Sequence, residues 1–323
     1  MLYVSQTLEV FHLAKKTIFI TFAIVLLAVS IFSMKLVFNK KEPDIVLAKI
    51  EKLSEINNQE TTPLRIALGT GISPQSNIEY HWDLIKLIET KTGRKVEVVQ
   101  KHSYADINYL LSLDLIDIAF VCSSSYVLAN EQAKVVDLIA IPKIYGEFEY
   151  QSYIIVRADS GINKLDDLKD KVFAFSDPVS TTGFFYPSYR LKELATSPDR
   201  FFSDFFFTHS HDKSIYAVIN GLADGAAVDS TVYTRITREY PDLNQKLLII
   251  EKSPKFLNSP IVARSSLDNN LKNSIINILT GIEEDPETIK IFNRYGIDGF
   301  AKEPPFGKNY EPVKEIIDKV RKQ

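Results

Sequence analysis

Short, mostly apolar runs alternate with amphipathic stretches through most of the chain after Pro63. The runs are typical of buried strands, and we expect strands at 64–68, 96–99, 117–121, 150–156, 171–175, 205–207 and 226–228. Stretches between several of them have helical spacing, such as the one through Trp82, Ile85 and Ile88 that stops at Gly93. Alternation of apolar strands with helices predicts a parallel α/β sheet.

Local signals refine the expected helix ends. Ser76-Asn77-Ile78-Glu79 fits a capping box that would open the first helix. Pro187 falls inside the helix expected from Thr181, so we predict a kink or a fresh start near Tyr186. Residues 267–322 are expected to form helices broken at Gly281, Gly296 and Pro304-Pro305.

The N-terminal part carries an uncharged apolar run, Thr17 to Met34, that is just long enough to cross a bilayer. Residues 1–16 form a tail that is long for a signal peptide, so we expect an uncleaved anchor over 17–38 and a linker over 39–62. A cleaved signal peptide stays open, because Ala28-Val29-Ser30 is an acceptable cleavage site. Lysines on both sides of the run leave its orientation open.

Composition narrows the class of protein. A chain of 323 residues can form two lobes, and 38 Lys and Arg against 41 Asp and Glu give a net charge of −3. This balance indicates no nucleic-acid surface. The single cysteine, Cys122, rules out a disulfide within the chain and ends an apolar run, so we expect a small buried side chain there.

Three consecutive hydroxyl residues, Ser180-Thr181-Thr182, follow the apolar run Val172 to Phe175 at the predicted start of a helix. A helix N-terminus offers unpaired N–H groups and partial positive charge, and hydroxyls add donors that rotate to meet an oxyanion. Gly183 would let the backbone approach closely. The alternative is that Ser180 or Thr181 simply caps the helix. No nucleotide P-loop pattern surrounds the stretch.

Other polar side chains also follow expected strands. They are Tyr104, the cluster Ser123 to Tyr126, the stretch Thr208 to His211 and the stretch Asp229 to Thr231. Ligands of parallel α/β sheets lie beyond the carboxyl ends of strands, so these residues could line one cleft. They could equally be loop residues that face water.

Residues 176–183, with Pro187 after them, resemble the Asp-Pro-x-Ser-Thr-Ser-Gly stretch of phosphonate-, phosphite- and phosphate-type periplasmic binding proteins. A second similarity runs from Ser210-His211 through Ala223-Asp224-Gly225 to Ser230, and a third covers Asp117 to Phe120. The similarity spans about residues 63–322. It departs from the family at Thr182, where serine is usual.

The resemblance implies an α/β, two-lobed type II periplasmic-binding-protein fold with a ligand cleft between lobes. Lobe 1 would comprise residues 63–155 and, with C-terminal helices, 259–323; lobe 2 would comprise 156–258. The lobes would join near 153–158 and 259–264. The ligand-binding residues implied by the resemblance are Tyr104, Ser125, Tyr126, Tyr150, Ser180, Thr181, Thr182, His211 and Asp229. As a cation, His211 would strengthen a bond to a dianion, and Asp229 is the one candidate for an aminoalkyl-binding acid.

The implied function is capture of a small phosphorus oxyanion for an ABC-type importer, with no cofactor or metal, and a transporter permease as partner. The soluble part would lie in the periplasm or outside the cell, attached to the cytoplasmic membrane. A tethered sensor that signals to a membrane partner is one alternative. A hydrolase using Ser180, His211 and Asp229 is another, although the chain has no Gly-x-Ser-x-Gly elbow.

Overall fold

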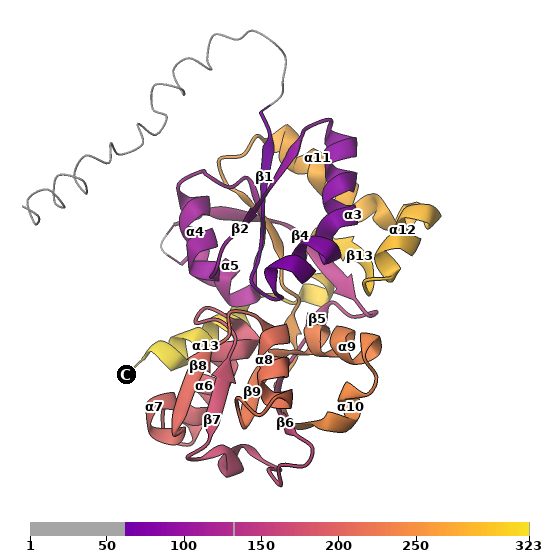
Figure 1. Ribbon diagram of the computed structural model, residues 1–323. Coiled ribbons are helices and arrows are strands. Elements are labelled where there is room, and N and C mark those ends of the chain that lie inside the picture. The colour runs from indigo at the N-terminus through magenta and orange to yellow at the C-terminus, as the bar shows by residue number, and fades with distance from the viewer. Residues whose placement is uncertain (1–61, 132, 323) are drawn as a thin grey trace, which may run out of the picture. The chain divides into compact units, whose positions relative to one another are not determined.

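The computed structural model describes residues 62–131 and 133–322. The tail at 1–16, the anchor expected at 17–38 and all but the last residue of the expected linker lie outside the described residues. Within these two ranges, no helix has the length and apolar character needed to cross a bilayer. The described residues form two lobes, each built on its own β-sheet (Figure 1).

The first lobe contains a six-stranded sheet in the order β13-β4-β12-β3-β1-β2. Its strands are β1 (Leu64–Leu68), β2 (Val96–Gln100), β3 (Ile118–Phe120), β4 (Val136–Ile144), β12 (Ile261–Arg264) and β13 (Ile297–Ala301). Strand β1 is parallel to β2 and β3, whereas β12 is antiparallel to β3 and β4, and β13 to β4. In this sheet the predicted parallel arrangement is therefore correct for β1 to β3 only, because β4, β12 and β13 make the sheet mixed. In the second lobe the prediction is correct for the strand at 172–175, which is parallel to those at 204–207 and 225–229.

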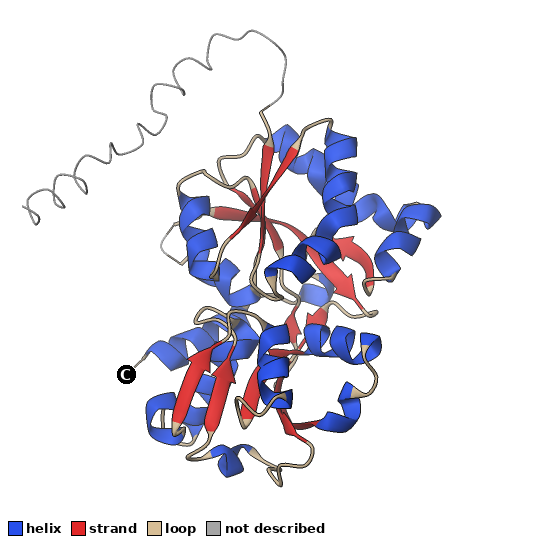
Figure 2. Ribbon diagram, in the orientation of Figure 1, coloured by secondary structure: helices blue, strands red, loops and turns tan. Residues whose placement is uncertain are grey.

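Helices cover both faces of this sheet (Figure 2). One face packs against α3 (Pro74–Thr92), α11 (Asn269–Thr280) and α12 (Pro286–Asn293), the other against α4 (Tyr104–Ser112) and α5 (Ser123–Ala129). Buried residues four apart, such as Leu84 and Ile88 or Ile107 and Leu111, give each helix its apolar stripe.

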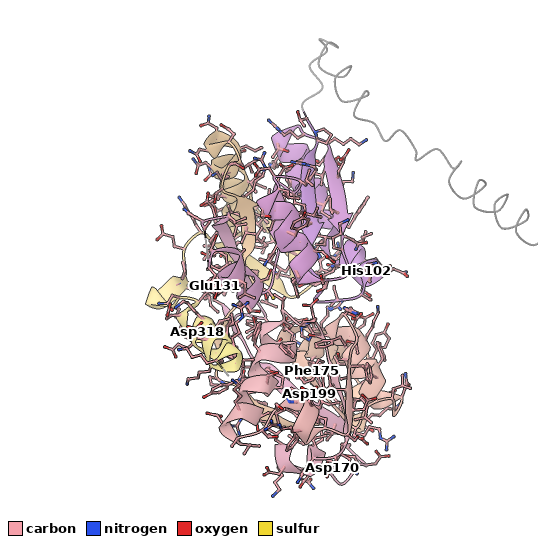
Figure 3. All side chains as sticks on the ribbon, turned by 90° about the vertical axis from the view of Figure 1, so that its left-hand side faces the viewer. His102, Glu131, Asp170, Phe175, Asp199 and Asp318 are labelled. Carbon is pink, nitrogen blue, oxygen red and sulfur yellow. The ribbon has the colours of Figure 1, made fainter. Side chains whose placement is uncertain are left out.

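The second lobe contains a five-stranded sheet in the order β10-β6-β9-β7-β8. Its strands are β6 (Ser152–Arg157), β7 (Val172–Phe175), β8 (Asp204–Phe207), β9 (Gly225–Asp229) and β10 (Leu247–Lys252). Its helices are α6 (Tyr186–Glu193), α7 (Pro198–Phe201), α8 (His211–Ile219), α9 (Ser230–Glu239) and α10 (Leu243–Lys246). Phe173 and Phe175 pack on one face of β7 and Ala174 on the other, and Figure 3 shows Phe175 inside this lobe.

The chain passes between the lobes at 145–151 and 253–260, where β5 (Glu149–Tyr150) pairs with β11 (Phe256–Leu257). The first crossing lies before the segment expected from the sequence, because β6 belongs wholly to the second sheet. The second crossing ends at residue 260, inside the expected segment 259–264, because β12 belongs wholly to the first sheet. A third passage leads to α13 (Glu311–Arg321), whose Val313 and Ile317 pack in the core of the second lobe. The described residues belong to one compact unit.

Two local expectations are wrong. Helix α3 starts at Pro74 after Ser73, so Ser76 lies inside it and caps nothing; proline suits the first helical turn. Residues 297–301 form strand β13, where helix was expected. Short 3₁₀ turns complete the described elements at Leu165–Leu168, Gly281–Glu284 and Pro305–Gly307.

Candidate functional site

The hydroxyl triplet Ser180-Thr181-Thr182 lies directly beyond the carboxyl end of β7 and is buried. Ser180 has extended backbone, with φ −68° and ψ 129°, and its Oγ accepts the N–H of Gly183 at 3.0 Å. Ser180 is therefore a helix cap. Thr181 and Thr182 carry the next two side chains of the turn that it caps.

This turn is π-helical and spans Thr181–Phe185. The N–H of Phe185 donates to the carbonyl of Ser180 at 3.0 Å, and α6 then begins at Tyr186. Pro187 has no N–H to donate and sits in the first turn of α6, where none is needed. The predicted fresh start near Tyr186 is confirmed.

Residues of the first lobe contact the triplet directly. The N–H of Ser124 donates to Oγ1 of Thr181 at 2.8 Å, and that hydroxyl donates to Oγ of Ser124 at 2.9 Å. Beside them, the hydroxyl of Tyr150 donates to Oγ of Ser123 at 3.1 Å. We call Ser123, Ser124, Tyr150, Ser180 and Thr181 the hydroxyl cluster. It brings neutral donors from both lobes to one place.

His211 joins this cluster from the first residue of α8. Its backbone N–H donates to the carbonyl of Gly71 in the first lobe at 3.0 Å, and its Nε2 lies 3.4 Å from Oγ of Ser180. Its Nδ1 accepts the backbone N–H of Asp229 at 3.1 Å. An accepting Nδ1 carries no proton, so the neutral ring has its N–H at Nε2. Burial lowers the pKa of His211, although Asp229 and Asp212 oppose this shift.

Asp229 is the N-cap of α9. Its Oδ1 accepts hydrogen bonds from the N–H of Thr231 at 2.7 Å, from the Thr231 hydroxyl at 2.7 Å and from the N–H of Val232 at 3.4 Å. The Asp229 side chain therefore caps this helix. The carboxylate bonds its own helix, while its backbone orients His211.

Two carboxylates of the second lobe bond backbone groups of the first. Oδ2 of Asp177 accepts the N–H of Tyr104 at 3.3 Å and the hydroxyl of Thr70 at 3.4 Å. Both oxygens of Asp212 accept the N–H of Ser73, at 3.0 and 3.1 Å. The lobes are therefore in direct contact on this side of the hydroxyl cluster.

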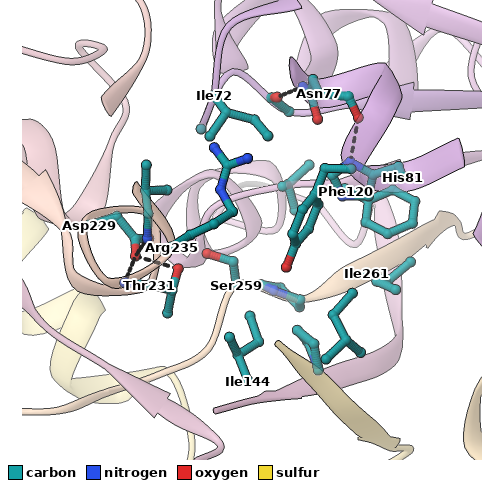
Figure 4. A pocket seen from close by; sticks show the side chains of 18 of the residues that line it. Ile72, Asn77, His81, Phe120, Ile144, Asp229, Thr231, Arg235, Ser259 and Ile261 are labelled. Carbon is teal, nitrogen blue, oxygen red and sulfur yellow. Dashed lines mark hydrogen bonds between the residues drawn. The ribbon is translucent and has the colours of Figure 1, made fainter. Parts of the chain in front are cut away.

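A cavity of about 140 Å³ lies between the lobes beside the cluster (Figure 4). Tyr104 and Asp229 are the predicted site residues that line it, whereas the hydroxyl triplet does not. Burial raises the pKa of Tyr104 well above its ordinary value, so its hydroxyl stays protonated. Gly69 lets this ring pack closely, because a Cβ there would lie 2.7 Å from its Cε1.

The chain is similar to known proteins in sequence and in fold. Residues 71–303 match the family described as ABC transporter, phosphonate, periplasmic substrate-binding protein. The chain belongs to this family. The resemblance read from residues 176–183, 210–230 and 117–120 is thereby confirmed.

Relatives in the phosphonate-binding family include "Phosphate-import protein PhnD" of Mycolicibacterium smegmatis, 34% identical over 59% of this chain and 63% of the relative's length. "Phosphonates-binding periplasmic protein" of Escherichia coli is 30% identical over 71% of this chain and 70% of its own. The solved binding-protein component of an ABC phosphonate transporter from Pseudomonas aeruginosa has a TM-score of 0.73 at 23% identity, covering 79% of this chain and 85% of that one. This likeness supports the two-lobed fold.

Two predicted residues lie away from the hydroxyl cluster. Oγ of Ser125 donates to Asn108 at 2.7 Å between α4 and α5, and Tyr126 packs against the ring of Tyr310 at 5.0 Å. In their place, Ser123 and Ser124 reach the cluster. Thr182 is next to the hydroxyl cluster in the chain, and its backbone carbonyl accepts a hydrogen bond from the hydroxyl of Ser152 at 2.6 Å.

Proposed function

We propose that the chain is an extracytoplasmic binding protein of an ABC-type importer and captures a small phosphorus oxyanion, either phosphonate, phosphite or phosphate. The observation that carries this proposal is the hydroxyl cluster, where neutral donors of both lobes converge on Thr181. The family and the names of its relatives support the ligand class and the importer.

The phosphoryl oxygens would replace the hydroxyl–hydroxyl bonds between the lobes. Ser180, Thr181 and Thr182 would bind them from the second lobe, and Tyr104 and Tyr150 from the first. Nε2–H of His211 points toward Ser180 and would add one more donor. Hydrogen bonds to a charged acceptor are about twice as strong as neutral ones, so such a set binds an anion without a fixed cation.

The geometry argues against the hydrolase alternative. A Ser-His-Asp triad needs Nε2 to accept the serine proton while the carboxylate accepts Nδ1–H. Here Nδ1 of His211 accepts a backbone N–H, and the Asp229 carboxylate caps α9. Ser180 has no general base in this arrangement. The relatives named above are likewise binding proteins.

We also propose that residues 17–38 attach the binding protein to the membrane, and that the two lobes, joined at 145–151 and 253–260, have a type II arrangement. The uncharged run from Thr17 to Met34 supports the anchor. An anchored chain should remain in the membrane fraction after an alkaline wash, whereas release would indicate cleavage. The sensor alternative has no specific contact in its favour among residues 62–131 and 133–322.

Calorimetry on the full chain tests the ligand class. We expect saturable binding of at least one of phosphate, phosphite, methylphosphonate and aminoethylphosphonate. Failure of all four phosphorus ligands to bind at millimolar concentration would refute the proposal.

A further inference from the structure

The cavity of about 140 Å³ beside the hydroxyl cluster has room for more than a tetrahedral oxyanion, since one water molecule needs only about 10–15 Å³ by the same measure. Most of its walls are apolar or aromatic, including Ile72, Leu84, Phe120, Ile144, Ile261 and Phe300. Ligand pockets with mostly apolar walls accommodate organic groups, and their few polar side chains determine which groups fit. The polar lining residues therefore indicate what the cavity selects.

Arg235 is the cation of this lining. It extends from α9, is half-buried, and Figure 4 shows its guanidinium reaching into the cavity. The other basic side chain of the lining, His81, is neutral near neutral pH, because burial lowers its pKa to about 4. Among the described lining residues, Arg235 thus carries the positive charge.

The guanidinium of Arg235 has no carboxylate partner among the ion pairs of the described residues. It lies over the ring of Tyr80, 5.4 Å from the ring centre. Asp229 lines the same cavity, but its Oδ1 is used in capping α9. An arginine presents five N–H donors in a planar fork that matches a carboxylate. The cavity therefore offers an unmatched site for an anionic group.

We propose that the cavity receives the organic substituent of the ligand and that Arg235 selects substituents that end in a carboxylate. This inference rests on the proposed function, since the hydroxyl cluster must bind the phosphoryl group. Asp229 and Arg235 are six residues apart, roughly 9 Å along α9. Asp229 lies at the end near His211 and would repel a carboxylate there. The preferred ligand thus has its two anionic groups separated by a carbon chain that lies on the apolar walls.

The test compares ligands of matched chain length by calorimetry on the full chain. One series is ω-carboxyalkylphosphonates with two, three or four methylene groups; the other is the corresponding alkylphosphonates, with methylphosphonate as reference. We expect the best carboxylate to bind about ten-fold tighter, or more, than its alkyl counterpart, as a hydrogen bond between charged groups implies.

Two variants of Arg235 test whether this residue causes the preference for a carboxylate. Arg235→Gln should reduce the carboxylate-to-alkyl ratio to about one, and Arg235→Lys, which keeps the charge, should retain part of it. Arg200→Gln removes an exposed arginine of α7 in the same lobe, outside the cavity lining, and should leave the ratio unchanged.

The outcomes separate the two proposals. If methylphosphonate binds but no carboxylate is preferred at any length, or if Arg235→Gln keeps the preference, the inference is wrong and the proposed function stands. If methylphosphonate and both series all fail to bind, the inference is wrong, and the proposed function falls with it only if phosphate, phosphite and aminoethylphosphonate also fail to bind.

Discussion

The imidazole of His211 is fixed in one tautomer by its neighbours. The backbone N–H of Asp229 donates to Nδ1 at 3.1 Å, which leaves the proton on Nε2 facing Ser180. A second proton on Nδ1 would remove this bond, and burial already lowers the pKa of the ring. His211 should therefore act as a neutral donor, contrary to the cationic role suggested by the sequence.

This assignment predicts the pH dependence of binding. His211→Gln keeps a neutral donor and removes the titration. The affinities of wild type and variant should therefore differ by a constant factor above the ordinary histidine pKa of about 6.5, because the pKa of His211 is lowered from that value. Ionisation of the ligand changes the affinity of wild type and variant alike, so the ratio of the two affinities reports on His211 alone. Calorimetry with methylphosphonate at several pH values measures this ratio. If the ratio of the wild-type affinity to the His211→Gln affinity rises steadily as the pH falls, the ring of His211 is protonated on binding.

At the scale of elements, the π-helical turn Thr181–Phe185 packs very closely on the end of β7. A Cβ at Gly183 would lie 1.8 Å from Oγ of Ser176, 2.7 Å from its Cβ and 2.9 Å from Cε1 of His211. Oγ of Ser176 is buried and makes no hydrogen bond to the described residues. The groups that approach the backbone of Gly183 closely are therefore the side chains of Ser176 and His211.

Gly183→Ala should lower the free energy of unfolding by about 1–3 kcal/mol, the usual range for overpacking a core. Denaturant unfolding measures the loss. Ser176→Gly removes both of the nearest atoms, so the double variant should lose less stability than the sum of the single variants. Additive losses would show that the clash with Ser176 is not the cause.

The strands around the site could be predicted because each is an apolar run that ends in polar residues. Strand β13 could not, since Asp298 and Gly299 interrupt the run, and Gly299 has a φ of +148°. Ser180 and Thr181 could be identified because they follow the apolar run of β7 after a four-residue turn, at the start of a helix. Ser125 was named in place of Ser124 because the direction of each serine depends on where α5 begins, at Ser123.

At the scale of the whole molecule, the two lobes meet through contacts that carry no sequence signal. Asp177 and Asp212 bond backbone N–H groups of the other lobe, and this depends on how the lobes pack. Burial raises the pKa of Asp212, but the hydrogen bonds from Ser73 outweigh it and leave the pKa below its ordinary value. The ionised carboxylate therefore stabilises the contact between the lobes.

Asp212→Asn replaces one acceptor oxygen with a donor that repels the Ser73 N–H. We expect faster amide hydrogen exchange around Ser73, measured by mass spectrometry on the full chain without added ligand. Asp199→Asn, an exposed change in the same lobe, is the control. Because the folded pKa is lowered, the effect should be complete above the unfolded carboxyl pKa and disappear as the pH falls through the folded value. Unchanged exchange around Ser73 would contradict this role.

The central claim is that the hydroxyl cluster binds the phosphorus oxyanion, and Thr181 is its central residue. Thr181→Val keeps the side-chain shape and removes the hydroxyl that bonds Ser124. Calorimetry with phosphate and methylphosphonate should show binding weakened by about 1.5–3 kcal/mol. Ser125→Ala, which removes a buried hydroxyl bonded to Asn108 away from the cluster, should bind like wild type. Unchanged affinity in Thr181→Val, in a variant that unfolds like wild type, would contradict the account.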